Sequence, residues 1–184
     1  MATRSSTAML AVVVALCGGC VIVDGKLAAD GSGTLEVTYR IPANSTEATE
    51  RARFTSPHVT VKSVKMQPDR AIVQVAFDDA TKLSTAEGLR ALDVSRSRSG
   101  AEETLRVVIT NPHPVDVRDE GREGPRVTLE LPGPVADAKP QAFEVNGNRV
   151  IWRIKFVDYV RNATTELVVR YTIPSSSSTM PQAG

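Results

Sequence analysis

The sequence predicts a β-rich α+β domain, built as an antiparallel curved sheet or partial barrel with two short helices. Three observations indicate this class. Apolar and polar residues alternate along most of the chain, as in strands with one buried face. Prolines fall between the alternating segments and not inside them. Only two stretches carry the polar residues that typically begin a helix.

The first two strands are expected to form a hairpin. Residues 21–27 lead into a glycine-rich turn at residues 30–33, and residues 35–41 then alternate strictly between apolar and polar. Further alternating segments predict strands at residues 59–66, 73–77, 105–109, 127–131, 150–156 and 167–173.

One of these strands changes its apolar parity partway along. Val59 and Val61 share one parity and Val64 shares the other, which predicts a β-bulge near Lys62 and Ser63. The Pro-Asp pair that follows at residues 68–69 predicts a turn and therefore a second hairpin.

The two predicted helices are short. Asn44 is placed to cap the first, with Glu47 at the capping-box position and Arg51 one turn later for an ion pair. Residues 84–87 show the same capping pattern for the second, although Gly88 lowers the helix propensity there.

Two polar segments are expected to be solvated loops. Residues 116–126 are highly charged and are interrupted by glycines. Arg96 and Arg98 lie in a Ser-rich connection before Gly100, which predicts an exposed hairpin tip; contact with lipid phosphates is the alternative.

An apolar leader that ends near a cysteine predicts a bacterial lipoprotein. The apolar run of residues 9–16 follows Arg4 and is too short to span a membrane. Gly18 and Gly19 supply the small side chains that a signal peptidase needs before its cut. We therefore expect residues 1–19 to be a signal peptide and Cys20 to carry diacylglycerol and palmitate.

Two other interpretations of the leader stay open. Cys17 stands where lipoprotein signals usually have a larger aliphatic residue, so a plain secretory leader with a free Cys20 thiol is one alternative. A redox Cys-x-x-Cys pair is the other, although these cysteines close an apolar leader and do not begin a helix. Residues 20–174 form the expected single domain, and residues 175–184 a disordered Ser-rich tail.

Composition excludes several classes of protein. The chain has 22 basic and 21 acidic residues, and removal of Arg4 with the leader leaves 21 of each. A neutral mature chain gives no reason to expect nucleic acid as a partner. Only Cys20 remains after cleavage, so the domain has no disulfide and must be stabilised by its core.

The sequence carries no catalytic motif, and we expect neither enzymatic activity nor a cofactor. It lacks a nucleophile elbow and a glycine-rich phosphate loop. His58 and His113 are far apart, and neither lies in a cluster with metal-ligand spacing. Asp78 and Asp79 end a strand on opposite faces, which favours a turn over a carboxylate pair.

Four aromatic residues are candidates for the lining of a ligand pocket. Tyr39, Trp152, Phe156 and Tyr171 lie at apolar positions of predicted strands. Such residues usually fill a core, and the sequence alone does not distinguish a filled core from a hollow one.

Short turn-rich motifs give the chain a resemblance to bacterial envelope lipoprotein domains of the LppM type. The matching segments are residues 19–27, the Leu-Pro-Gly-Pro-Val segment at 131–135 and the Asn-Gly hairpin that ends in tryptophan at 146–152. The resemblance implies a β-rich α+β domain with a role in binding lipids or glycolipids. Family members commonly have a hydrophobic C-terminal segment, whereas this chain ends in a polar tail, so anchorage is expected to rest on the N-terminal acyl chains.

We therefore expect a non-catalytic lipoprotein, anchored in the cell envelope, that binds a lipid or other apolar ligand. The alternative is a structural module that binds other proteins of an envelope assembly through a strand edge or an apolar patch. Val21 follows Cys20 where an aspartate would retain a lipoprotein at the inner membrane, so the outer membrane is favoured if the host has two.

Overall fold

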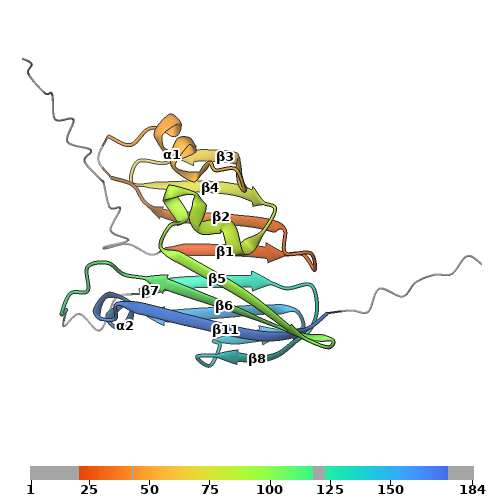
Figure 1. Ribbon diagram of the computed structural model, residues 1–184. Helices are drawn as coiled ribbons and strands as arrows, with labels where there is room; N and C mark the ends of the chain where they lie inside the picture. The colour runs from red at the N-terminus through yellow and green to blue at the C-terminus, as the bar shows by residue number, and fades with distance from the viewer. Residues whose placement is uncertain (1–20, 43, 118–122, 174–184) are drawn as a thin grey trace, which may run out of the picture.

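The computed structural model describes residues 21–42, 44–117 and 123–173. The predicted leader, the lipidation site at Cys20 and the predicted tail lie outside these residues. Figure 1 shows two β-sheets with short helices placed around them. The β-rich α+β class is confirmed, but the strands form two sheets and not one, and the described part of the chain contains no closed barrel.

The larger sheet has seven strands in the order β3-β4-β2-β1-β7-β10-β9. All its neighbours are antiparallel except β1 and β7, which run parallel. The strands are β1 (Ile22–Leu27), β2 (Gly33–Arg40), β3 (Val59–Met66), β4 (Arg70–Phe77), β7 (Glu123–Glu130), β9 (Glu144–Asn146) and β10 (Arg149–Lys155).

The smaller sheet has four antiparallel strands in the order β5-β6-β11-β8. They are β5 (Leu92–Ser99), β6 (Glu102–Thr110), β8 (Val135–Lys139) and β11 (Thr164–Thr172). The chain enters this sheet through β5 and returns to the larger sheet at β7.

The predicted hairpins are present. β1 pairs with β2 across the glycine-containing turn, in which Gly31 has a φ of 95°. β3 pairs with β4, and the register shifts between Val61 and Ser63, which confirms the predicted bulge. β5 and β6 meet at Gly100, whose φ of 62° suits a tight hairpin turn.

The first helix, α1 (Glu47–Phe54), begins two residues later than predicted. Thr46 and not Asn44 is the N-cap, because Thr46 and Thr49 cap each other: the Thr49 amide donates to Thr46 Oγ1 over 3.2 Å and the Thr46 amide to Thr49 Oγ1 over 2.9 Å. The predicted pairing of Glu47 with Arg51 is confirmed at 3.0 Å.

The second predicted helix is two 3₁₀ turns, η1 (Ala80–Thr85) and η2 (Glu87–Leu89). Asp79 caps η1 by accepting from the Thr81 amide over 2.9 Å, which confirms its turn-forming role. A Cβ atom on Gly88 would lie 2.7 Å from the Phe54 ring, so close packing on α1 is what requires a glycine here.

The sequence pattern did not predict α2 (Phe156–Arg161), because apolar and polar residues alternate up to Phe156 and indicated a strand there. Strand β10 stops at Lys155 after a register shift. Tyr159 and Val160 are the buried residues of the helix that follows, three and four positions after the partly buried Phe156, and this helical spacing cannot be recognised from periodicity over only six residues.

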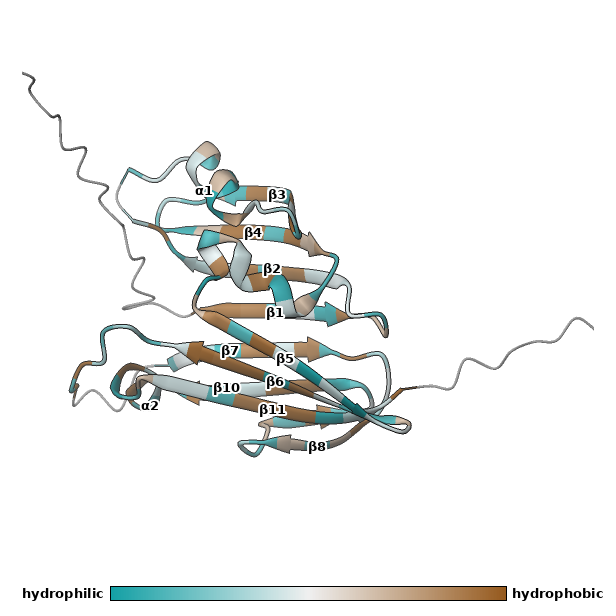
Figure 2. Cartoon of the chain, in the orientation of Figure 1, coloured by the Kyte–Doolittle hydropathy of each residue, from teal (hydrophilic) through white to brown (hydrophobic). Residues whose placement is uncertain are grey.

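The core lies between the larger sheet and the elements that pack against one of its faces. Helix α1 packs on β3 and β4, and η1 contacts β3 and β5. Apolar side chains of both sheets form one continuous core. Figure 2 shows hydrophobic residues concentrated along β1, β6 and β7.

An apolar cavity between the two sheets

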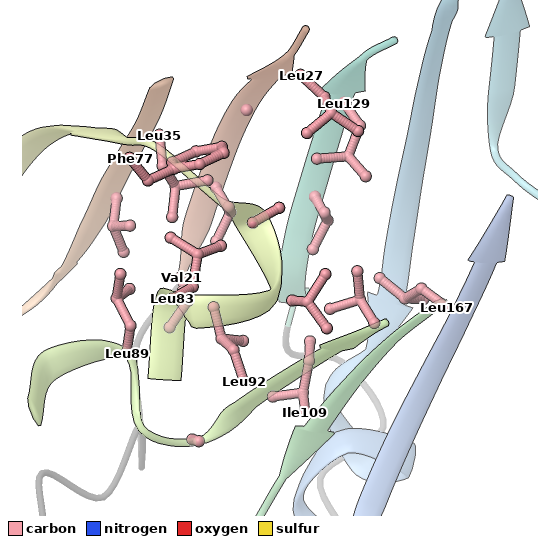
Figure 3. Close-up of a pocket in the computed structure, with 18 of the residues that line it drawn as sticks. Val21, Leu27, Leu35, Phe77, Leu83, Leu89, Leu92, Ile109, Leu129 and Leu167 are labelled. Carbon is pink, nitrogen blue, oxygen red and sulfur yellow. The ribbon is translucent and has the colours of Figure 1, made fainter. Parts of the chain in front are cut away.

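A cavity of about 120 Å³ lies inside this core. It is bounded by β1, β2 and β7 on one side, by β5 and β6 on the other, and by η1 and η2 (Figure 3). For comparison, an engineered apolar cavity of ~150 Å³ stays dry and binds benzene. The space therefore suits part of an apolar ligand.

The cavity wall is almost entirely hydrocarbon. Lys26 is the only charged residue among those that the structure places in the wall. The side chains that point into the cavity in Figure 3 include Val21, Leu35, Phe77, Leu83, Ile109 and Leu167. Such a wall offers burial of apolar surface as its main source of binding energy, worth ~25 cal/mol per Å².

Strand alternation explains why these residues face inward. Val21, Val23 and Leu27 occupy every second position of the first strand segment, and Gly25 lies between them on the same face. A Cβ atom at Gly25 would lie 2.9 Å from the Leu129 side chain, so the glycine leaves room at this point. Several inward-facing residues are only partly buried because the cavity lies beside them: Val23, Leu92, Val107 and Leu129.

A buried ion pair lies beyond one end of the cavity. Along the inner face of the smaller sheet, Leu105 is followed by Glu103, which pairs with Arg96. The Glu103 side chain is 4% exposed and that of Arg96 is 17% exposed. Arg96 also donates to the Ala29 carbonyl over 3.0 Å and so links the smaller sheet to the β1–β2 turn.

This pair corrects the prediction of an exposed basic hairpin tip for Arg96, because the inward parity of β5 places its side chain between the sheets. Arg98 lies further along the hairpin and is exposed, as expected.

The four aromatic candidates lie in the core, and the residues lining the cavity are a different, mostly aliphatic set. Trp152 is buried and donates from Nε1 to the Pro140 carbonyl over 3.0 Å. Tyr171 is fully buried beside the Arg96–Glu103 pair, and its hydroxyl group makes no well-formed hydrogen bond. Phe156 begins α2 and is partly buried against the core. A ligand-binding role for these residues stays a prediction.

The fourth candidate, Tyr39, belongs to a polar cluster under α1. Its hydroxyl group donates to Glu50, which is fully buried and also accepts from Ser45 and, over 2.9 Å, from Arg53. The Tyr39 ring lies 5.8 Å from that of Phe54. Burial, reinforced by the neighbouring Glu50 carboxylate, raises the pKa of Tyr39 well above its ordinary value.

This raised pKa predicts a pH dependence of stability. Because the folded state holds the Tyr39 proton more tightly, its contribution is complete below about pH 10 and is lost as the pH rises further. The free energy of unfolding should therefore fall as the pH rises above about 10. Tyr39→Phe should show a shallower fall in urea titrations, and an identical pH profile would contradict the assignment.

Sequence reasoning could have found the cavity-lining residues from the alternation of β1, β5, β6 and β7, but that pattern is the same for a packed core. His58 pairs with Asp78 on the surface over 3.1 Å, and His113 is exposed in a loop. The described residues contain no group of His, Cys, Asp and Glu that could hold a metal ion. None of their helices has the length and apolar character needed to cross a membrane.

Comparison with solved structures gives a fold match. The folded domain of the LppM protein of Mycobacterium tuberculosis, determined by NMR, superposes with a TM-score of 0.54 at 15% sequence identity. The match covers 85% of this chain and 90% of the LppM chain. No protein-family model and no curated protein sequence matches. This chain therefore has the fold of the LppM domain, as its turn-rich motifs predicted.

Proposed function

We propose that this protein is a membrane-anchored, non-catalytic envelope lipoprotein that binds the acyl chain of a lipid, or another apolar ligand, between its two sheets. The observation that carries the proposal is the apolar cavity, with a hydrocarbon wall and about 120 Å³ of space. The fold shared with a lipoprotein domain and the Cys20 signal in the sequence support the anchoring. Localisation at an outer membrane, where the host has one, is part of the same proposal, because the residue after Cys20 is Val21 and not the aspartate that would retain a lipoprotein at the inner membrane.

A fluorescent fatty acid tests this function. The full chain with Cys20→Ser, which lacks the thiol proposed to carry the acyl chains, should bind dansyl-labelled undecanoic acid with an increase in dansyl emission. Val107→Phe, which adds a ring to the cavity wall, should weaken binding by about tenfold, because the ring takes the space that the acyl chain needs.

Val108→Phe is the matched control, since the neighbouring residue of β6 points to the other face of the smaller sheet. It should leave the affinity within about twofold. Equal weakening by both substitutions, or no binding by the Cys20→Ser chain without further substitution, would contradict a ligand site in the cavity.

A protein-interaction module is the second candidate function, and one surface favours it. The short edge strand β9 and the residue before it expose large apolar side chains: Phe143 is 57% exposed and Val145 is 49% exposed. An edge strand offers unpaired backbone groups to a partner strand. Crosslinking of the intact protein in its native membrane, compared between the parent chain and Phe143→Ser, would test this surface.

A further inference from the structure

The two ends of the cavity differ in chemistry. At the end near Leu27, Arg96 links Glu103 on the smaller sheet to the Ala29 carbonyl on the β1–β2 turn. A Cβ atom on Gly31 would overlap the Arg96 guanidinium, so the arginine side chain fills the space there. An apolar chain entering at this end would have to displace a buried ion pair, which is unfavourable.

The opposite end is formed mostly by apolar side chains. Val21, Leu92, Ile109, Pro125 and Tyr159 line the cavity there. These residues lie at the same end of the cavity: Leu92 pairs with Ile109, and the starts of β1 and β7 lie side by side. Figure 1 shows α2 at the end of the molecule where β1 begins, and the β5–β6 turn at the other end.

An exposed apolar residue lies beside this end. Val115 is 47% exposed, and its amide donates to the Val160 carbonyl of α2 over 2.9 Å. Asn111 donates to the same carbonyl over 3.0 Å, and Arg161 pairs with Asp116 over 2.9 Å. The loop therefore holds an apolar side chain toward solvent next to the helix that supplies Tyr159 to the cavity wall.

The chain itself connects this end to the proposed anchor. Val21 is in the cavity wall and 7% exposed, and Cys20 is the residue before it. Consecutive Cα atoms are ~3.8 Å apart, so acyl chains on Cys20 would hold the Val21 end of the cavity close to the bilayer.

We propose that the cavity receives an acyl chain of a bilayer phospholipid through its Val21 end, which the Cys20 anchor keeps against the membrane. The inference rests on the proposed function and adds the source of the ligand and its route. A chain that enters here passes from the bilayer into the cavity without crossing water, so its apolar surface stays buried throughout.

The experiment compares two positions of the same tether. One version of the full chain keeps Cys20, and the other has Cys20→Ser with Ser99→Cys in the exposed β5–β6 hairpin; both carry Cys17→Ser. Each is coupled through its remaining thiol to a maleimide phospholipid in phosphatidylcholine–phosphatidylglycerol vesicles. The vesicles also contain a phosphatidylcholine with a diazirine in one acyl chain, and irradiation is followed by peptide mapping.

The Cys20-tethered protein should show at least about tenfold more label on cavity-wall peptides of β6 and β7 than the Ser99→Cys version, because a tether helps only where its geometry permits engagement. Equal labelling from both tethers would overturn the route. A parallel sample carries the diazirine on the tethering lipid instead, and label in the cavity from that lipid would also overturn the route, since the occupant would then be the protein's own anchor.

The same measurement separates this inference from the proposed function. Absence of cavity label in both versions, while the Cys20→Ser chain binds the dansyl fatty acid in solution, overturns the route and leaves the function standing. Absence of binding in both assays overturns the function as well.

A surface substitution provides a second readout. Val115→Glu places a charge beside the proposed entrance and should lower cavity labelling of the Cys20-tethered chain by about fivefold. Val145→Glu is the control, since Val145 is equally exposed but pairs with Val150 near the opposite end of the sheet. Equal effects of the two substitutions would overturn the entrance at Val115.

Discussion

Cys20→Ser is expected to move the protein from the membrane fraction to the soluble fraction almost completely. Each buried methylene of an acyl chain contributes about 0.8 kcal/mol to membrane attachment, and two or more chains give stable anchoring. A serine hydroxyl at this position provides no thiol for the thioether to diacylglycerol. The measurement is the distribution of the full-length protein between fractions, with the intact mass of the membrane-extracted parent chain beside it.

Cys17→Ser is the matched control for this prediction, because the sequence places Cys17 inside the leader and not at its cleavage site. It should leave attachment and acyl mass unchanged. An unmodified Cys20 in the parent chain, or membrane attachment that survives Cys20→Ser, would refute the lipoprotein interpretation.

Arg96→Ala is expected to destabilise the fold by about 3 kcal/mol. The substitution leaves the Glu103 carboxylate buried without its cation, because Glu103 is only 4% exposed. It also removes the hydrogen bond to Ala29 that joins the two sheets. The free energy of unfolding from urea titration, compared with that of the parent chain, measures the effect.

Arg106→Ala tests whether burial is the cause. Arg106 pairs with Glu166 on the same sheet, but the two side chains are 46% and 50% exposed. Exposed ion pairs contribute at most about 1 kcal/mol, so this variant should stay close to the parent chain. Similar losses for the two arginine variants would show that the position of Arg96 between the sheets has no special effect on stability.

Much of the local structure could be predicted because local patterns determine it. The alternation of residues 35–41, the bulge near Ser63 and the hairpin at Gly100 are all present. Each depends on residues that are close in the chain, where strand period and turn chemistry act directly.

The cap of α1 shows where the local patterns lead to a wrong prediction. Asn44 and Thr46 are both suitable capping residues, and the choice depends on the reciprocal hydrogen bonds between Thr46 and Thr49. Likewise, the predicted second helix is two 3₁₀ turns, and the need for a glycine at position 88 comes from its packing against Phe54, which is far away in sequence.

The sequence by itself determined most of the strands but not β5, β8 and β9, and it determined the hairpins, the resemblance to LppM-type domains and the lipidation prediction at Cys20, because these depend on local periodicity and short motifs. Only the tertiary structure decided that the strands divide into two sheets, that β1 and β7 pair in parallel, and that a cavity lies between them. An alternating strand has the same pattern whether its apolar face meets a tightly packed layer or an open space. The distance between two sheets depends on side chains that are brought together from distant parts of the chain.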